Sequence, residues 1–73
     1  MTQTWFGSPP DLCELCKEPF ASVFYDARIN HAPPHLRGKW ALLCRKCFIA
    51  TEGRLGLNYG QEYDLQTLKK LRG

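Results

Sequence analysis

The four cysteines are the residues of this chain whose type and spacing most clearly indicate a chemical role. They form two pairs, Cys13-x2-Cys16 and Cys44-x2-Cys47, separated by 27 residues. A C-x2-C turn directs two thiolates toward one point, and two such turns complete a closed, tetrahedral site of four sulfur ligands. The usual separation is about 15–20 residues, and a hairpin with a longer loop would absorb the excess. We therefore predict one structural Zn2+ ion bound by all four cysteines.

Two other uses of these cysteines are disfavoured by the rest of the chain. Disulfides need an oxidising compartment, and residues 1–10 show neither the basic region nor the apolar stretch of a secretory signal. A thioredoxin-like redox pair needs a βαβ pattern, which surrounds neither motif. No segment approaches the roughly 20 apolar residues of a membrane span. We expect a cytoplasmic protein with no membrane partner.

The length of the chain also favours a metal. With 73 residues it has room for one domain, and natural scaffolds below roughly 70–80 residues usually add a metal, disulfides or a partner chain. We predict a lead-in segment over residues 1–11, although Trp5 and Phe6 are apolar enough to pack back onto the domain. Residues 12–73 are predicted to form a single zinc-binding domain.

A mixed ligand set of Cys13, Cys16, His31 and His35 also has finger-like spacing, C-x2-C-x14-H-x3-H. Such a finger needs both histidines on one helix face, but the prolines at positions 33 and 34 lie between them. Proline lacks the N–H donor, and its ring clashes inside a helix. This set would also leave the second cysteine pair without a role. We reject it and expect both histidines in an exposed loop.

The segments between the cysteines must bring the two pairs together. Residues 22–28 are rich in aromatic and β-branched side chains and predict a strand, and residues 39–43 predict the returning strand that leads directly into Cys44. Residues 29–38 contain two prolines and a glycine, which predicts a loop. The two cysteine knuckles are therefore expected to be joined by a β-hairpin.

The chain after the second knuckle is less clearly patterned. Residues 48–52 predict a short helix stopped by Gly53. Residues 61–64 predict a short strand, while Asp64 could equally cap one or two helical turns with the leucines at 65, 68 and 71 on one side. We predict a small, metal-stabilised α+β fold, a zinc ribbon or treble-clef-like arrangement with a short helix after the second knuckle.

Three glycines punctuate residues 53–60. Such a segment could cradle a phosphate, but it lacks the Lys-Ser/Thr of a P-loop and the glycine spacing of a dinucleotide fold. Turns that need positive φ angles are the better explanation.

A series of short motifs spans residues 12–64. The motifs CxxC, FxDxR, GxWA, CxxC, GL and GQxY begin at Cys13, Phe24, Gly38, Cys44, Gly56 and Gly60. This series resembles a family of small, largely uncharacterised bacteriophage zinc-knuckle proteins. The resemblance implies a phage protein acting in the cytoplasm of a bacterial host, and it implies no known activity. Members of that family often have His directly after the second knuckle, where this chain has Phe48.

Charge is unevenly distributed along the chain. Its formal net charge is +3, with −2 in residues 1–36 and +5 in residues 37–73. Four thiolates with Zn2+ contribute −2, so the metal-bound protein would be near +1. Basic groups interleaved with aromatic ones suit a phosphate backbone and exposed bases. A solvated basic face that offsets the anionic metal centre is the alternative. The candidate residues for binding nucleic acid or another partner are Arg37, Lys39, Trp40, Arg45, Lys46, Arg54 and Tyr59.

These observations predict a non-enzymatic zinc module, because four thiolates leave no open coordination position for Lewis-acid chemistry. The favoured partner is nucleic acid or a nucleic-acid-processing complex, and no small-molecule substrate is expected. A phage-encoded inhibitor that binds a host protein is the alternative, since the aromatic residues exceed what so small a core hides. A degenerate His-Asn-His-type nuclease is a third possibility. Against it, Asn30 adjoins His31, and Phe48 replaces the required second histidine.

Overall fold

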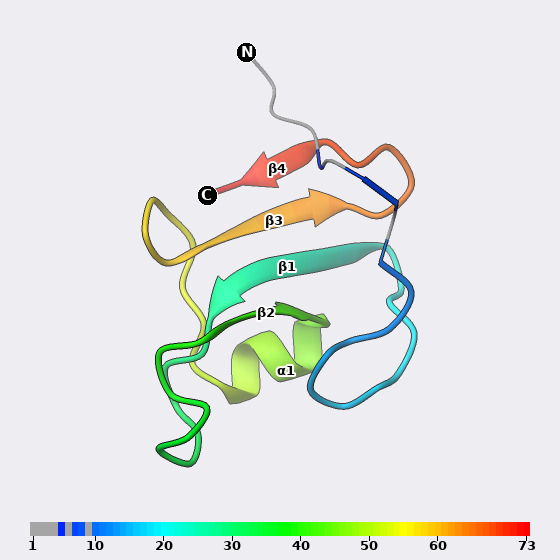
Figure 1. Ribbon diagram of the computed structural model, residues 1–73. Coiled ribbons are helices and arrows are strands. Elements are labelled where there is room, and N and C mark those ends of the chain that lie inside the picture. Colours follow the sequence, from blue (N-terminus) through cyan, green and yellow to red (C-terminus); the bar gives the residue numbers. More distant parts are fainter. Residues whose placement is uncertain (1–4, 6, 9) are drawn as a thin grey trace.

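Four antiparallel strands and one short helix form the part of the chain that the computed structural model describes, namely residue 5, residues 7–8 and residues 10–73 (Figure 1). The elements are β1 (Val23–Arg28), β2 (Trp40–Leu43), α1 (Arg45–Ala50), β3 (Gly60–Asp64) and β4 (Lys70–Arg72). The strands form one sheet in the order β2-β1-β3-β4. The small α+β class expected from the sequence is confirmed.

β1 is the centre of the fold because it pairs with both β2 and β3. Its sequence is rich in the β-branched and aromatic side chains that suit a pleated, half-buried surface. Arg28 lies opposite Trp40 of β2, and Phe24 lies opposite Tyr63 of β3. The predicted hairpin is therefore confirmed, and each of its strands begins one residue later than expected.

The two faces of the sheet are covered differently. Alternation along β1 places Tyr25 and Ala27 on one face and Phe24 and Arg28 on the other. α1 packs on the first face, where the ring of Phe48 stacks on Tyr25 with 4.1 Å between centroids. The helix therefore protects only one side of the sheet.

At one end of the opposite face lies a cluster that we call the aromatic core, formed by Trp5, Phe20, Phe24 and Tyr63. Phe24 stacks on Tyr63 at 5.3 Å between centroids, and Trp5 meets both rings edge-on at 5.4 and 5.5 Å. The Trp5 backbone N–H also donates to the Leu68 carbonyl at 2.8 Å. Trp5 thus packs onto the sheet, while Phe6 lies outside the described residues.

The predicted start of the helix was wrong by three residues. α1 begins at Arg45 rather than at residue 48, because Cys44 at the end of β2 already acts as its N-cap residue. The Cys44 carbonyl accepts the first helical hydrogen bond from the Phe48 N–H at 2.8 Å. The second knuckle and the helix are therefore one structural unit. α1 has six residues, and no helix within the described parts of the chain is long and apolar enough to cross a membrane.

The helix ends in a Schellman motif. The Gly53 N–H donates to the Phe48 carbonyl at 2.8 Å, and the Glu52 N–H donates to the Ile49 carbonyl at 3.0 Å. The residue in the left-handed region is Glu52, with φ 55°, and not the predicted stop Gly53. Glycine is needed at 53 for a different reason: any Cβ there would collide with the ring of Phe48.

The last part of the chain settles two open alternatives. The segment ending at Asp64 is β3, so the strand prediction for residues 61–64 is confirmed and the helical alternative is wrong. The Asp64 carboxylate accepts the Gln66 N–H at 2.9 Å and so starts a turn, after which β4 pairs back on β3. The leucine spacing that suggested a helix instead belongs to a turn and an edge strand.

Candidate metal centre

The first cysteine pair lies in a tight turn before β1. The Lys17 N–H donates to the Cys13 carbonyl, and the Cys13 N–H donates to the Glu18 carbonyl, both at 2.9 Å. Lys17 adopts φ 66°, which reverses the chain directly after Cys16. These backbone bonds orient both sulfurs toward the interior, where Cys13 is fully buried.

Glu14, between the two cysteines of the first pair, joins this turn to the edge of the sheet. Its N–H donates to the Leu42 carbonyl at 2.9 Å, and its carboxylate accepts the Leu42 N–H at 2.6 Å. Leu42 is two residues before Cys44 on the outer edge of β2. This reciprocal pair of hydrogen bonds holds the first knuckle beside the second.

The second pair is positioned by the junction of β2 and α1. Cys44 is extended, with φ −76° and ψ 169°, while Cys47 lies in the first turn of the helix and is 6% exposed. The Thr51 N–H donates to the Cys47 carbonyl at 2.9 Å. One sulfur is therefore presented from the strand end and the other from the helix.

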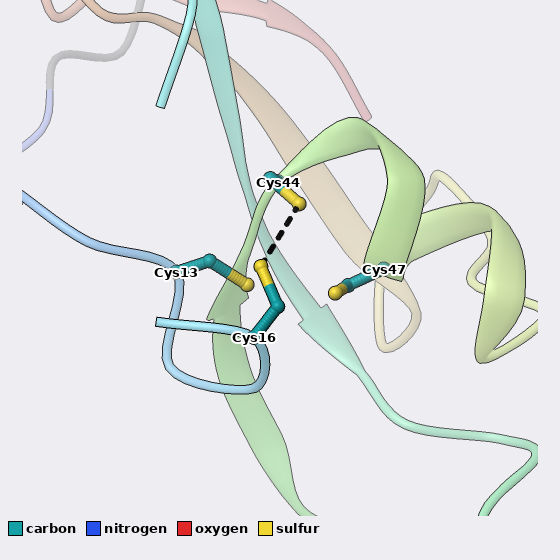
Figure 2. Close-up of side chains that lie close together, drawn as sticks. All are labelled: Cys13, Cys16, Cys44 and Cys47. Atoms are coloured by element: carbon teal, nitrogen blue, oxygen red, sulfur yellow. Dashed lines mark hydrogen bonds between the residues drawn. The ribbon is translucent and has the colours of Figure 1, made fainter. Parts of the chain in front are cut away.

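All four sulfurs meet at one point between the turn and the helix (Figure 2). They lie within 4.8 Å of one another, and the Cys16 and Cys44 sulfurs are 3.8 Å apart. A tetrahedral ion with metal–sulfur bonds of about 2.3 Å requires sulfurs about 3.8 Å apart. The cluster could therefore hold one metal ion with small adjustments of the side chains.

The electrostatics of the cluster also suit a cation. Burial raises the pKa of the Cys13 thiol, but backbone N–H groups of Cys16, Cys44 and Leu15 stabilise its thiolate and bring that pKa down to about 6. Burial, together with the neighbouring sulfurs, raises the pKa of the Cys47 thiol. One thiolate therefore forms readily and resists a second negative charge beside it. A bound cation is what would allow all four sulfurs to be thiolates.

The pKa of the Cys16 thiol depends on the same kinds of effect. The Glu18 backbone N–H stabilises its thiolate, but burial and the adjacent sulfurs outweigh that effect, so the pKa of Cys16 is raised.

The two histidines of the rejected ligand set lie away from the cysteines. His31 and His35 are both exposed, and His31 Nδ1 is 3.6 Å from a carboxylate oxygen of Glu52. Within the described residues, the four cysteines are the one group of three or more candidate ligand side chains whose donor atoms converge.

The seven residues predicted to bind nucleic acid or a partner do not form one patch. Arg45 and Lys46 are exposed on the first turn of α1, beside the cysteine cluster. Trp40 lies at the other end of β2, and a span of four strand residues separates it from Cys44 by roughly 13 Å. The candidates therefore lie in more than one region of the surface.

The remaining candidates are spread around the end of the sheet that holds Trp40. Trp40 and Tyr59 are 45% and 41% exposed, and Lys39 directly precedes Trp40. Arg54 lies near Gly60 on the α1 face of the sheet, since a Cβ on Gly60 would point toward Ala27 and lie 2.6 Å from the Arg54 carbonyl oxygen. Arg37 lies in the adjoining loop, where its guanidinium donates to the Ala32 carbonyl at 3.3 Å.

Sequence reasoning missed two residues of these regions. Glu14 forms its bonds to Leu42 across 28 positions, and no local signal indicates such a contact. Arg28 lies between Trp40 and Tyr59 on the same sheet face, with its guanidinium carbon 5.7 Å from the centroid of the Tyr59 ring. The alternation of side chains along the strand predicts the face on which Arg28 lies. Its neighbours on that face are known only from the register between the strands.

Comparison of the chain with family models, curated proteins and solved structures found no match.

Proposed function

We propose that the cysteine cluster holds one structural Zn2+ ion and that the protein is a small zinc module. The observation that supports this proposal is the meeting of four sulfurs at the spacing of a tetrahedral thiolate site. Thiolate ligands select zinc over the harder cations that prefer oxygen. A first knuckle, a hairpin and a helix that starts at the second knuckle favour the treble-clef-like form of the predicted fold over a zinc ribbon.

The proposed role of this ion is structural, and the protein is proposed to be non-enzymatic. Four protein ligands close a tetrahedral coordination sphere, so no position remains for a water molecule or a substrate. The burial of Cys13 and Cys47 agrees with a metal that stabilises the fold.

We further propose that the module binds nucleic acid or a nucleic-acid-processing complex. The observation behind this is the charge of residues 37–73, which have eight basic and three acidic side chains. Five of these basic residues flank the cysteine cluster or the exposed aromatic residues: Arg37, Lys39, Arg45, Lys46 and Arg54. The motif series in residues 12–64 supports a phage accessory or regulatory protein in a bacterial cytoplasm.

A second candidate function is direct binding to a host protein. The exposed apolar side chains favour it, especially Leu57 at 82% and Ile49 at 63%. Apolar anchors of this kind commonly contribute to protein interfaces.

Salt-dependent binding would test the nucleic-acid proposal. Fluorescence anisotropy would follow labelled DNA and RNA between about 50 and 200 mM salt, and the logarithm of affinity should fall with the logarithm of salt by roughly 0.7–0.9 per neutralised phosphate. Lys39→Gln, Arg45→Gln and Arg54→Gln should each weaken binding of all sequences and lower that slope by about one unit.

Lys69→Gln is a matched control for charge, because Lys69 lies in the turn between β3 and β4, at the sheet end away from Trp40. Its effect should be smaller. Absence of binding to both polymers, together with capture of a host protein, would replace this proposal with the second candidate.

A further inference from the structure

The exposed end of the sheet face opposite α1 carries a row of three side chains, from β2, from β1 and from the turn directly before β3. Trp40 of β2 pairs with Arg28 of β1, and the Arg28 N–H donates to the carbonyl of Tyr59, directly before β3, at 2.9 Å. Residues directly opposite each other in antiparallel strands point to the same face. We call these three residues the aromatic row.

Among the described residues, neither α1 nor the aromatic core lies over the aromatic row. α1 packs on the opposite face through Phe48 and Tyr25. The aromatic core covers the same face as the row, but at the far end, where Phe24 pairs with Tyr63. Trp40 and Tyr59 consequently leave 45% and 41% of their surface in contact with solvent.

Arg28 is held in place beside the Tyr59 ring. Its Nε–H donates to the Asn30 side-chain oxygen at 3.2 Å, and the Asn30 amide donates to the Glu52 carbonyl at 2.9 Å. The guanidinium lies over the Tyr59 ring, with 5.7 Å between its carbon and the ring centroid. A guanidinium has five N–H donors, so an Arg28 fixed through Nε can still present its other donors to a phosphate or a base edge.

The dimensions of the row suit separate bases of an unpaired strand. Trp40 and Tyr59 are two strand spacings apart, which is roughly 10 Å. Exposed aromatic side chains on neighbouring strands of a four-stranded sheet are a known platform on which two or three bases of a single strand stack. A duplex cannot use such a platform, because its bases already stack on each other inside the helix.

The charges along this face place cations at the row and acids farther along the sheet. Arg28 is the cation within the row, and Lys39 directly precedes Trp40. Arg54 lies on the α1 face, where its carbonyl faces the Cβ position of Gly60 beside Ala27. Two acids lie farther along the sheet: Asp26, which pairs with Leu42 and Gln61 two residues along β1 from Arg28, and Glu14, whose carboxylate accepts the Leu42 N–H at the edge of β2. Their carboxylates disfavour a phosphate over the middle of the sheet, so a bound strand should cross at the row itself.

We infer that the aromatic row binds single-stranded nucleic acid, with bases stacked on Trp40 and Tyr59 and Arg28 contacting the strand between them. This inference rests on the proposed nucleic-acid binding, and it adds the form of the polymer and the surface. The same bases with their phosphates could come from DNA or RNA, so both are used in the test.

The test compares labelled oligothymidylate and oligouridylate of about 12 nucleotides, within the usual site sizes of single-strand binders, with a duplex of equal length. The zinc-loaded full chain should bind the single strands at least about tenfold more tightly than the duplex. Trp40→Ala and Tyr59→Ala should each lower single-strand affinity by about 5- to 150-fold, the range expected for loss of one stacked base. Trp40→Phe should restore much of the lost affinity, because it keeps a ring.

Two further measurements make the result specific to this surface. The chain has two tryptophans, so a Trp5→Phe variant leaves Trp40 as the single reporter, and its fluorescence should be quenched by the oligonucleotide with the same midpoint as the anisotropy. Ile49→Ala removes an exposed apolar side chain from α1, on the opposite face, and should leave affinity unchanged. Thermal unfolding of each variant separates lost binding from lost folding.

The outcomes distinguish this inference from the function on which it rests. Equal binding of single strands and duplex, with Trp40→Ala and Tyr59→Ala unchanged while the lysine and arginine variants weaken binding, overturns the aromatic row and leaves nucleic-acid binding intact. No binding of any of the three oligonucleotides overturns both.

Discussion

The sheet face opposite α1 has aromatic side chains at both ends, and the two ends differ in what covers them. At the β3–β4 turn end, Trp5 and Phe20 pack over Phe24 and Tyr63, so that Phe24 is completely buried. At the other end, none of the described residues covers the aromatic row in this way, and Trp40 and Tyr59 remain nearly half exposed.

The same residue types therefore have two uses on one surface. The aromatic core removes apolar area from water during folding, which is where most of its contribution to stability arises. The aromatic row keeps a large part of its ring surface in water, so binding a partner can still gain from burying it. The difference lies in the covering segments and not in the strands themselves.

The largest effect is expected from loss of the metal, which should unfold the aromatic core and the aromatic row together. Cys13 and Cys47 belong to the same buried cluster as the aromatic core, so the core should depend on the metal. Structural zinc supplies about 10–16 kcal/mol in small fingers, which matches or exceeds the whole stability of a typical domain, about 5–15 kcal/mol. Cys47→Ser should abolish one-to-one zinc binding in native mass spectrometry and abolish cooperative folding.

His31→Ala is the control for this experiment, because the His31 side chain is 73% exposed. It should keep one zinc ion per chain and normal unfolding. A cooperatively folded Cys47→Ser chain without metal, or loss of zinc from the histidine variant, would contradict the four-cysteine centre.

The second prediction compares the two aromatic regions directly. Phe24→Ala should lower the free energy of unfolding by about 3–5 kcal/mol, because it opens a cavity in the aromatic core. Trp40→Ala should lower it by about 1 kcal/mol or less, as for other surface positions. Urea denaturation of the zinc-loaded variants measures both values.

If Phe24→Ala is too unstable to measure, Phe24→Leu leaves a smaller cavity and should still cost more than Trp40→Ala. Equal losses at the two positions would show that the exposed row also contributes to folding, and the distinction between the two regions would fail.

The smallest predicted effect concerns a buried carboxylate on the α1 side of the sheet. It compares the stability that a buried polar group contributes with the stability that buried aromatic rings contribute. Arg72, through its hydrogen bonds, and then the Tyr25 hydroxyl hold the pKa of the buried Glu62 carboxyl below its ordinary value of 4.5. Because Arg72 is itself mostly exposed, Glu62→Gln should cost only about 1–2 kcal/mol at neutral pH.

The pH dependence of this difference follows from the direction of the shift. A carboxyl with a depressed pKa in the folded state contributes stability fully above its unfolded pKa, near 4.5, and loses it as pH falls through the lower folded value. The stability difference between the natural chain and Glu62→Gln should therefore be constant above about pH 5 and shrink below it. Loss of metal at acid pH affects both chains equally, so a difference that instead grows with acid would contradict the Glu62 assignment.

Sequence alone was sufficient for the cysteine cluster and the hairpin. Two residues between cysteines place both sulfurs on one turn, whatever the rest of the chain does, and the content of residues 22–28 and 39–43 favours strands locally. The helix was predicted too late because residues 45–47 were assigned to the knuckle alone, although a cysteine knuckle can also be the first turn of a helix.

The tertiary structure decided three other features: the separation of the basic residues on the surface, the hydrogen bonds between Glu14 and Leu42, and the aromatic row. Each depends on which strands are neighbours and in which register, and that choice is made by side chains far apart in the sequence. Arg28, Trp40 and Tyr59 appear in three separate segments, and only the pairing of β1 with both β2 and β3 sets them side by side. Local spacing determined the pairing of the cysteines in each knuckle, while long-range strand pairing determined which surface the fold leaves exposed.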